Sequence, residues 1–457
     1  MKIGKKILGV VVLVLVMCMF QPTEMEAAKT YYKGDVIEIN SKEPIDRLYI
    51  LWDTIPGEWT LTVDGQEFTY GTYEFIHEYV EPGVSGYNWK ITIQCDKVIL
   101  GKLYSYKVGE ELDDFVQIWE PPCEDADMLV FPTHADDEIL FFGGTLPIYA
   151  GELDMDVQVV YLTNHWDNGR YRVHELLNGI WTCGVTNYPV IGPFKDLYTK
   201  YSLDKAKALY DVDAVTQFQV WVLRRFKPEV LIAHDFNGEY GHGVHILNAH
   251  LMKDAVVLAN DPTYNPEEVA LYGTWDLPKW YAHLYEENRV TFMWDDKLES
   301  FGGKTAYEVA TEALYCYESQ WRYYGSIARD DSNMSSIHYG LYRSTVGLDV
   351  KKDSFFENIT VFSDDAVTTP DEPSTEPGAD TTPDTDTTPG TDTTPGTDTT
   401  PGTEPDTNKT PDNNTEQDTT PLDPQEEDSR GIIALIAGIV VVVVTAMRLV
   451  LQRKQNK

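Results

Sequence analysis

Hydrophobic and polar residues alternate along the N-terminal part of the chain. The runs Trp59–Val63 and Phe68–Tyr70 keep this period of two on either side of Asp64-Gly65. An Asp-Gly pair between two alternating runs predicts a β-hairpin. Trp89–Ile93 alternates in the same way, and Val98–Val108 is a longer run of the same kind. The pattern therefore predicts a series of strands.

These strands predict a small all-β, sandwich-like domain over residues 29–120. No helical periodicity of useful length interrupts them, and Pro121-Pro122 follows. The sequence identifies no binding site in this domain. It either binds a glycan or serves as a packing platform, and the platform is the simpler interpretation because a fold does not imply a function.

From Ala126 the pattern changes to apolar runs that alternate with helical segments. Such alternation predicts a parallel sheet covered by helices, here a Rossmann-like α/β domain over residues 121–362. The expected strands are Met128–Phe131, Val157–Leu162 and Val230–Ala233, and the expected helices are Glu138–Ala150, Arg172–Gly184, Asp211–Lys227, Val244–Leu258 and Thr305–Tyr317. The stretch Tyr339–Ile359 is expected to close the domain.

The composition changes completely after Phe362. Residues 363–430 contain 19 acidic and two basic residues and repeat Thr-Asp-Thr-Thr-Pro-Gly, a composition typical of a disordered, Pro-rich stalk. Residues 431–451 are almost entirely apolar and long enough for a transmembrane helix. Residues 452–457 are basic, so the positive-inside rule predicts a cytoplasmic tail and an extracellular position for everything before the span.

Residues 1–28 have the layout of a secretory signal peptide. Lysines near the start precede the apolar run Ile7–Phe20, and a polar segment ends at Ala27-Ala28. This order predicts export, with cleavage near Ala27 or Ala28. Together with the C-terminal span, it predicts a single-pass protein on the extracellular face of the membrane.

The chain is strongly acidic, with a formal net charge of −38. Nucleic-acid affinity comes mainly from Lys and Arg side chains that neutralise phosphates. The chain has no basic stripe to supply them, so no nucleic-acid partner is expected. Nothing in the sequence decides the oligomeric state.

Four cysteines remain after the expected signal peptide: Cys95, Cys123, Cys183 and Cys316. An even number permits disulfides outside the cell. Their spacing matches no known framework, so the sequence leaves the pairing open.

Metal-capable side chains follow two of the predicted strands. The stretch His134–Glu138 comes directly after the first strand, and His234–His245 comes after the third. Parallel strands present their carboxyl ends at one edge of a sheet, so His134, Asp137 and His245 are able to converge there. Two imidazoles and one carboxylate are a catalytic zinc set with one position left open. Helix capping by the acidic residues is the alternative.

The two stretches resemble the motifs of the PIG-L/LmbE family of zinc-dependent N-acetylglucosamine deacetylases. The family's first motif is His-Pro-Asp-Asp-Glu, matched by residues 134–138, and its second is Gly-x-Tyr-Gly-His-Pro-Asp-His, matched by residues 238–245. The resemblance implies that His134, Asp137 and His245 bind Zn²⁺.

The resemblance also implies roles for three neighbouring residues. Asp136 matches the family's base and is expected to take a proton from water and pass it to the departing amine. His242 is expected to assist the oxyanion, and Tyr240 to donate a further hydrogen bond.

A further helix extends the resemblance. Arg172-x-x-Glu175 followed by Cys183-Gly184-Val185 is similar to the family's Arg-x-x-Glu helix and its Leu-Gly-Val end. The matching residues imply that Arg172 and Asp196 bind sugar hydroxyls. A plain surface ion pair is the alternative explanation for Arg172 and Glu175.

The chain departs from the family pattern at two positions. Ala135 replaces Pro, which removes no functional group. Val244 replaces an Asp between the paired histidines, so any carboxylate that orients an imidazole has to come from elsewhere, and Asp235 is the nearest candidate.

We therefore expect a zinc-dependent hydrolase that removes the N-acetyl group from N-acetylglucosamine in an extracellular glycan or glycoconjugate. One alternative is a glycan-binding adhesin with an inactive hydrolase fold, and another is a zinc amidase acting on cell-wall peptides. The intact ligand and base residues favour an enzyme. The sequence decides neither the glycan nor the native metal.

Overall fold

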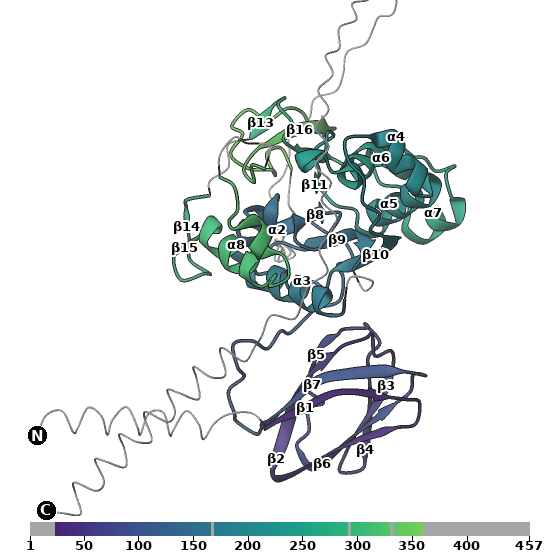
Figure 1. Ribbon diagram of the computed structural model, residues 1–457, viewed down its shortest axis with the longest axis vertical. Coiled ribbons are helices and arrows are strands. Elements are labelled where there is room, and N and C mark those ends of the chain that lie inside the picture. The colour runs from purple at the N-terminus through teal and green to yellow at the C-terminus, as the bar shows by residue number, and fades with distance from the viewer. Residues whose placement is uncertain (1–22, 166–168, 291–293, 330–331, 333, 360–457) are drawn as a thin grey trace, which may run out of the picture. The chain divides into compact units, whose positions relative to one another are not determined.

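The computed structural model describes residues 23–165, 169–290, 294–329, 332 and 334–359. Within these residues the chain forms two seven-stranded sheets, a two-stranded hairpin and a set of helices (Figure 1). The expected stalk, the C-terminal span and most of the signal peptide lie outside the described residues. No helix in the described part of the chain has the length and apolar character needed to cross a membrane.

The N-terminal sheet has the strand order β1-β7-β2-β6-β3-β4, with β5 paired to β2. All its pairs are antiparallel. The strands are β1 (Thr23–Tyr31), β2 (Val36–Trp52), β3 (Trp59–Val63), β4 (Gln66–Tyr70), β5 (His77–Val80), β6 (Gly86–Ile93) and β7 (Val98–Lys107). Pairing of β1 with β7 is interrupted between Glu26 and Lys29, which is where cleavage is expected.

The predicted hairpin is present. Val63 of β3 pairs with Gln66 of β4, so Asp64-Gly65 forms a two-residue loop. Both loop residues have positive φ angles, 43° and 95°, as a type I′ turn requires. The sequence pattern was therefore sufficient to define this turn.

The strand β2 changes partners along its length. Val36–Asn40 pairs with β6, a register shift follows, and Leu48–Leu51 pairs with both β5 and β7. Trp52, Trp59 and Trp89 are each at most 1% exposed and belong to the hydrophobic core of the N-terminal sheet. The strands are joined in one continuous sheet, so the prediction of a sandwich-like domain is met only in part.

The second sheet has the order β10-β9-β8-β11-β12-β16-β13. Its strands are β8 (Met128–Phe131), β9 (Val157–Asn164), β10 (Val190–Lys195), β11 (Val230–Ala233), β12 (Lys279–His283), β13 (Arg289–Val290) and β16 (Tyr339–Ser344). Pairs from β10 to β12 are parallel, as predicted, and β16 is antiparallel to β12 and β13. The strand order reverses between β8 and β11, and such switch points bind ligands in open α/β sheets.

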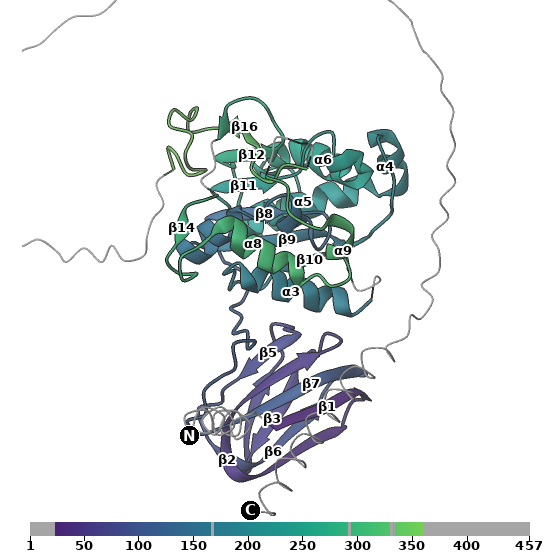
Figure 2. The same ribbon diagram turned by 60° about the vertical axis from the view of Figure 1, so that its left-hand side comes forward.

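Helices cover both faces of this sheet (Figures 1 and 2). The α-helices are α2 (Asp137–Leu140), α3 (Tyr171–Thr182), α4 (Leu203–Leu209), α5 (Val212–Phe226), α6 (Gly243–Ala259), α7 (Pro266–Tyr272), α8 (Ala306–Tyr315) and α9 (Trp321–Tyr324). Met128 and Val130 of β8 share a core with α3 and α8, whereas Leu129 and Phe131 share the other core with α5 and α6. Alternate residues of a fully buried strand thus stabilise both layers.

Two predicted helices begin at the caps that their sequences specify. The side chain of Asp211 accepts a hydrogen bond from the Ala214 N–H at 3.1 Å and caps α5. Thr305 and Glu308 form a capping box at the start of α8. The cap at α5 and the reciprocal hydrogen bonds at α8 satisfy backbone N–H donors that a helix leaves free at its N-terminus.

The predicted helix over Glu138–Ala150 is wrong. The helix α2 ends at Leu140, and a π-helical segment, η1 (Pro147–Glu152), follows after a break. Gly143 and Gly144 occupy the break, and a Cβ atom on Gly144 would lie 2.2 Å from the Trp294 indole. The packing against Trp294 therefore requires a glycine at position 144, and two adjacent glycines also disfavour a continuous helix.

The four cysteines that the sequence left open form no disulfide among the described residues. They are Cys95, Cys123, Cys183 and Cys316.

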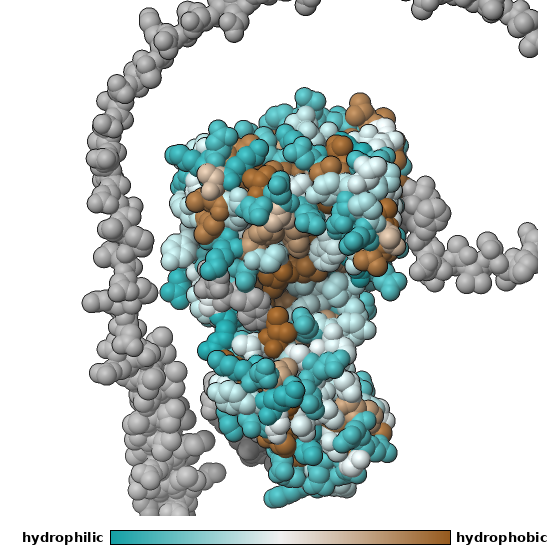
Figure 3. Space-filling view, turned by 90° about the vertical axis from the view of Figure 1, so that its right-hand side faces the viewer, coloured by the Kyte–Doolittle hydropathy of each residue, from teal (hydrophilic) through white to brown (hydrophobic). Residues whose placement is uncertain are grey.

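Figure 3 shows the side of the molecule that carries α4 to α7, where hydrophobic residues are interspersed with hydrophilic ones. Leu209, Val257 and Leu271 are among the exposed apolar residues of these helices. Scattered exposure of this kind is ordinary and identifies no docking surface.

Glu78 accepts three hydrogen bonds inside the N-terminal sheet: from Trp52 Nε1 at 2.9 Å, Trp59 Nε1 at 3.0 Å and the Gly71 N–H at 3.0 Å. Burial raises the pKa of Glu78 to about 7, so the test belongs at pH 8, above that value. We predict that Glu78→Gln lowers the free energy of unfolding by about 1–3 kcal/mol. The amide nitrogen of Gln cannot accept a hydrogen bond, so at least one buried N–H donor loses its acceptor.

Urea unfolding of the wild type and the variant measures this loss. Glu67→Gln on the exposed side of β4 is the matched control and should stay within about 0.5 kcal/mol of wild type. Equal stability of wild type and Glu78→Gln would show that the three donors do not depend on the carboxylate.

Candidate functional site

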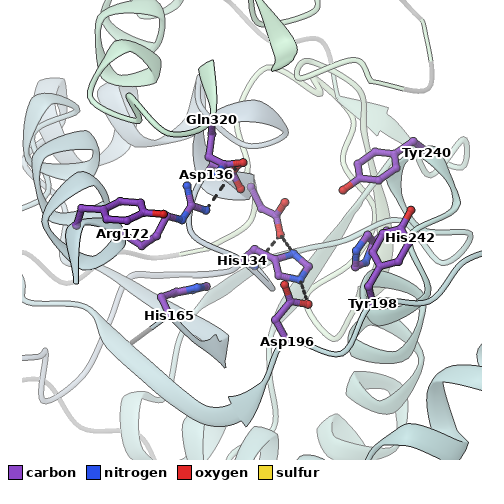
Figure 4. A pocket seen from close by; sticks show the side chains of 11 residues that line it. His134, Asp136, His165, Arg172, Asp196, Tyr198, Tyr240, His242 and Gln320 are labelled. Atoms are coloured by element: carbon purple, nitrogen blue, oxygen red, sulfur yellow. Dashed lines mark hydrogen bonds and ion pairs between the residues drawn. The ribbon is translucent and has the colours of Figure 1, made fainter. Parts of the chain in front are cut away.

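A cavity of about 290 Å³ lies at the carboxyl ends of the parallel strands. The residues that line it come from the loops after β8, β9, β10 and β11, from the start of α3 and from the segment between α8 and α9 (Figure 4). They are His134, Asp136, Asp137, His165, Tyr171, Arg172, Asp196, Tyr198, Tyr240, His242 and Gln320. Seven of the eight predicted site residues are in this set, and the eighth, His245, is fully buried next to it.

Three atoms of the predicted metal ligands form a small triangle. His134 Nδ1 lies 3.1 Å from Asp137 Oδ2 and 3.0 Å from His245 Nε2. Asp137 Oδ2 lies 3.2 Å from His245 Nε2. The structure thus brings together residues that are more than 100 positions apart in the sequence.

Hydrogen bonds on the far side of both rings determine which nitrogens carry protons. His134 Nε2 donates to Asp196 Oδ1 at 3.1 Å, and His245 Nδ1 donates to Glu239 Oε2 at 2.7 Å. In their neutral forms the two rings therefore direct lone pairs at each other and at the Asp137 carboxylate. These lone pairs and the negative carboxylate repel one another, and a divalent cation between the three atoms would remove that repulsion. Two imidazoles with one carboxylate suit zinc. The residues present fit a metal ion.

His234 and His242 are the other imidazoles close enough to bind the same ion. His234 Nε2 accepts the N–H of Thr133 at 2.8 Å, and His234 Nδ1 donates to Glu239 at 2.8 Å. Both nitrogens of His234 are therefore already used. His242 Nδ1 has no hydrogen-bond partner within the described part of the chain, and burial lowers the pKa of His242 to about 3. This neutral ring is free to contact a ligand.

Glu239 is the orienting carboxylate, and the expectation that Asp235 takes this role is wrong. Glu239 Oε2 accepts from His234 and His245, and Glu239 Oε1 accepts from His283 Nδ1 at 2.6 Å. Burial by itself raises the pKa of Glu239, but the imidazoles hold it well below its usual range. The Asp235 carboxylate instead accepts from the Asn237 side chain at 3.4 Å. Glu239 occupies the variable position x in Gly-x-Tyr-Gly-His. The motif therefore did not indicate a role for this residue.

Asp136 is the N-cap residue of α2, yet its side chain makes no capping hydrogen bond. Its φ angle of 116° lies in the left-handed region, which is rare for a residue with a side chain. The carboxylate lines the cavity and lies 3.8 Å from Arg172 Nη2. Burial raises the pKa of Asp136 well above its usual range, with Arg172 opposing and Asp137 and Glu138 adding to the effect. Capping therefore does not account for Asp136.

Arg172 and Glu175 are in contact at 3.4 Å, but they are not a surface pair. Arg172 is only 6% exposed, lines the cavity and also donates to the Ala135 carbonyl and to Ser319 Oγ. Asp196 lies on the opposite side of His134 (Figure 4) and holds that ring through one carboxylate oxygen. Both residues are placed to meet a ligand in the cavity.

Several cavity residues were missed by the sequence analysis. His165 follows β9, Tyr198 follows β10, Tyr171 is the first residue of α3, and Gln320 directly precedes α9. They stand outside the two motifs and come from separate segments of the chain. Only the folded sheet edge brings them to the same cavity.

Residues 129–256 match the family described as PIG-L: GlcNAc-PI de-N-acetylase. Two similar proteins are 1D-myo-inositol 2-acetamido-2-deoxy-alpha-D-glucopyranoside deacetylases. Deacetylase 1 of Catenulispora acidiphila is 30% identical over 34% of this chain and 54% of its own length, and deacetylase 2 of Saccharopolyspora erythraea is 32% identical over 32% and 61%. The chain thus spans less than two thirds of either relative.

A solved structure of N,N'-diacetylchitobiose deacetylase from Pyrococcus horikoshii is also similar. It is 18% identical, with a TM-score of 0.32, and the match covers 45% of this chain and 76% of that one.

We predict that the double variant His134→Ala/His245→Ala loses the bound metal ion, because only one atom of the triangle remains. Metal analysis of purified protein after mild chelation and zinc reloading measures the stoichiometry. His250→Ala, a half-buried histidine of α6 that contacts the Phe236 carbonyl, is the control. Unchanged metal content in the double variant would contradict the assignment.

Glu239→Gln should weaken zinc affinity by about 10–100-fold while leaving the three ligand atoms in place, because the carboxylate sets the tautomer of His245. Competition with a chromogenic chelator measures the affinity. Asp235→Asn is the matched control, since that carboxylate contacts no imidazole among the described residues. Equal losses in both variants would mean that general damage, rather than the His245 contact, causes the effect.

Proposed function

Because residues 129–256 form a PIG-L domain, we propose that this protein is a zinc-dependent hydrolase that removes the N-acetyl group from N-acetylglucosamine in an extracellular glycan or glycoconjugate. The observation that carries the proposal is the triangle of His134, Asp137 and His245 next to the uncapped carboxylate of Asp136. Ligand atoms and a base in one polar cavity are what hydrolysis of an amide needs.

A divalent cation held by His134, Asp137 and His245 would supply a Lewis acid for the acetyl carbonyl and for water. Asp136 takes the proton of the attacking water and returns it to the nitrogen as the C–N bond breaks, which yields acetate and an amine. The raised pKa of Asp136 suits both steps. His242 and Tyr240 line the opposite side of the cavity (Figure 4) and donate to the carbonyl oxygen as its negative charge develops.

The walls of the cavity suit a sugar. The Arg172 guanidinium and the Asp196 carboxylate line the cavity on opposite sides of His134 and bind sugar hydroxyls there. Tyr171 and Tyr198 also line the cavity and are 55% and 64% exposed. Exposed aromatic rings at a polar cavity provide apolar faces on which a second sugar ring packs, so a glycan fits better than an isolated monosaccharide.

An extracellular position is part of the proposal. It is supported by the sequence patterns of residues 1–28, 363–430 and 431–451. N-acetylglucosamine outside a cell occurs in peptidoglycan, wall polymers and host glycans. The acidity of the chain disfavours polyanionic partners.

The direct test is acetate release by residues 29–362 with zinc. The substrates are N-acetylglucosamine, its oligosaccharides, peptidoglycan fragments and mucin-type glycans. The proposal expects acetate, with oligosaccharides preferred over the monosaccharide. Release of amino acids or peptides would instead support the amidase alternative, and binding without any acetate would support the adhesin.

We predict that Asp136→Asn retains zinc and lowers kcat by about 10²–10⁴-fold, because the amide cannot accept the proton of water. Acetate release and metal content are measured on the same sample. Asp213→Asn, an exposed position on α5, serves as the control. Near wild-type turnover with zinc bound would require a different base.

A further inference from the structure

His165 is a buried histidine whose ring nitrogens make no hydrogen bond to any described residue. It directly follows β9 and is fully buried, and neither ring nitrogen has a hydrogen-bond partner within the described part of the chain. It nevertheless lines the cavity, where Figure 4 places it beside Arg172 and near Asp196. A buried polar group that stays unpaired is destabilising, so such a group calls for an explanation.

Packing alone does not explain the residue. The imidazole contacts the Tyr161 ring edge-on, with centroids 5.5 Å apart. A phenylalanine makes the same contact without any unpaired nitrogen. The charged or titratable groups that act on His165 are His134, Arg172, Asp137 and Asp196, and each of them already has a partner.

The protonation state limits the chemistry of a ligand. Burial lowers the pKa of His165 to about 3, and His134 and Arg172 lower it further than Asp137 and Asp196 raise it. The ring is therefore neutral at physiological pH and offers one N–H donor and one lone pair. A hydroxyl group also both donates and accepts, whereas a carboxylate only accepts and an ammonium only donates.

We propose that His165 binds a hydroxyl of the acetylated sugar and, together with Arg172 and Asp196, selects the configuration of the sugar ring. This inference rests on the proposed deacetylase function. His165 is then a specificity-determining residue that touches the substrate but takes no part in proton transfer. A site built to hydrogen-bond a hydroxyl rejects analogues that lack it, because its buried polar group is left unpaired.

Two variants test the proposal. His165→Phe keeps the ring that packs against Tyr161 and removes both nitrogens, whereas His165→Gln keeps one donor and one acceptor. We expect His165→Phe to lower kcat/KM for an N-acetylglucosamine oligosaccharide by about 10–100-fold, mostly through KM, and His165→Gln to recover part of the loss. Zinc content should equal that of wild type, and His250→Ala should behave as wild type.

Deoxy analogues that each lack one ring hydroxyl identify the partner. For the analogue without the hydroxyl that His165 binds, wild type and His165→Phe should hydrolyse at similar rates, whereas the other analogues should keep the full difference. Equal kinetics of wild type and His165→Phe on every substrate overturn the proposal. Loss of zinc, or the same loss of activity on every analogue, also overturns it in favour of a ligand or structural role.

Failure of the proposed function gives a different result. In that case the wild type releases no acetate from any sugar, and binding of the same oligosaccharide is measured by titration calorimetry. Weaker binding to His165→Phe than to wild type then supports hydroxyl recognition by His165. Equal affinity, or no binding to either protein, counts against it.

Discussion

The buried carboxylate of Glu239 is hydrogen-bonded to three histidines from different segments of the α/β domain, next to the candidate metal site. Glu239 accepts hydrogen bonds from His234 after β11, His283 at the end of β12 and His245 in α6. It is fully buried, and the imidazoles around it offset the cost of burying its charge. Because His245 donates to Glu239 through Nδ1, its Nε2 is left to face His134 and Asp137. The chemistry of the cavity depends on this contact.

Three adjacent acids have three different surroundings. The carboxylate of Asp137 faces His134 and His245, that of Asp136 faces the cavity, and that of Glu138 contacts Tyr317 within the core. Asp136 precedes α2 with a left-handed backbone, so its side chain does not follow the helical arrangement of Asp137 and Glu138. Strain at such a position is tolerated when the surrounding structure holds it, and here α2 and Arg172 do so.

Local patterns predicted β3, β4, β6 and β7 of the first sheet, β8, β9 and β11 of the second, the Asp64-Gly65 turn and the helices near Asp211 and Thr305, because each depends on neighbours in sequence. They did not predict the break after Leu140, which arises where Trp294 packs against a glycine far from it in the chain. They also did not predict that the strands of the N-terminal part form one continuous sheet. Contacts of this kind depend on how distant segments meet.

The same division holds in the site. The sequence by itself determined which residue types follow β8 and β11, and the shared edge of a parallel sheet made the meeting of His134, Asp137 and His245 predictable. Only the tertiary structure decided which ring nitrogens carry protons, that Glu239 rather than Asp235 orients His245, and that His165 lines the cavity without a hydrogen bond to any described residue. The physical reason is that a side chain's hydrogen-bond partners and burial are set by residues distant in sequence, whereas residue type and periodicity are local.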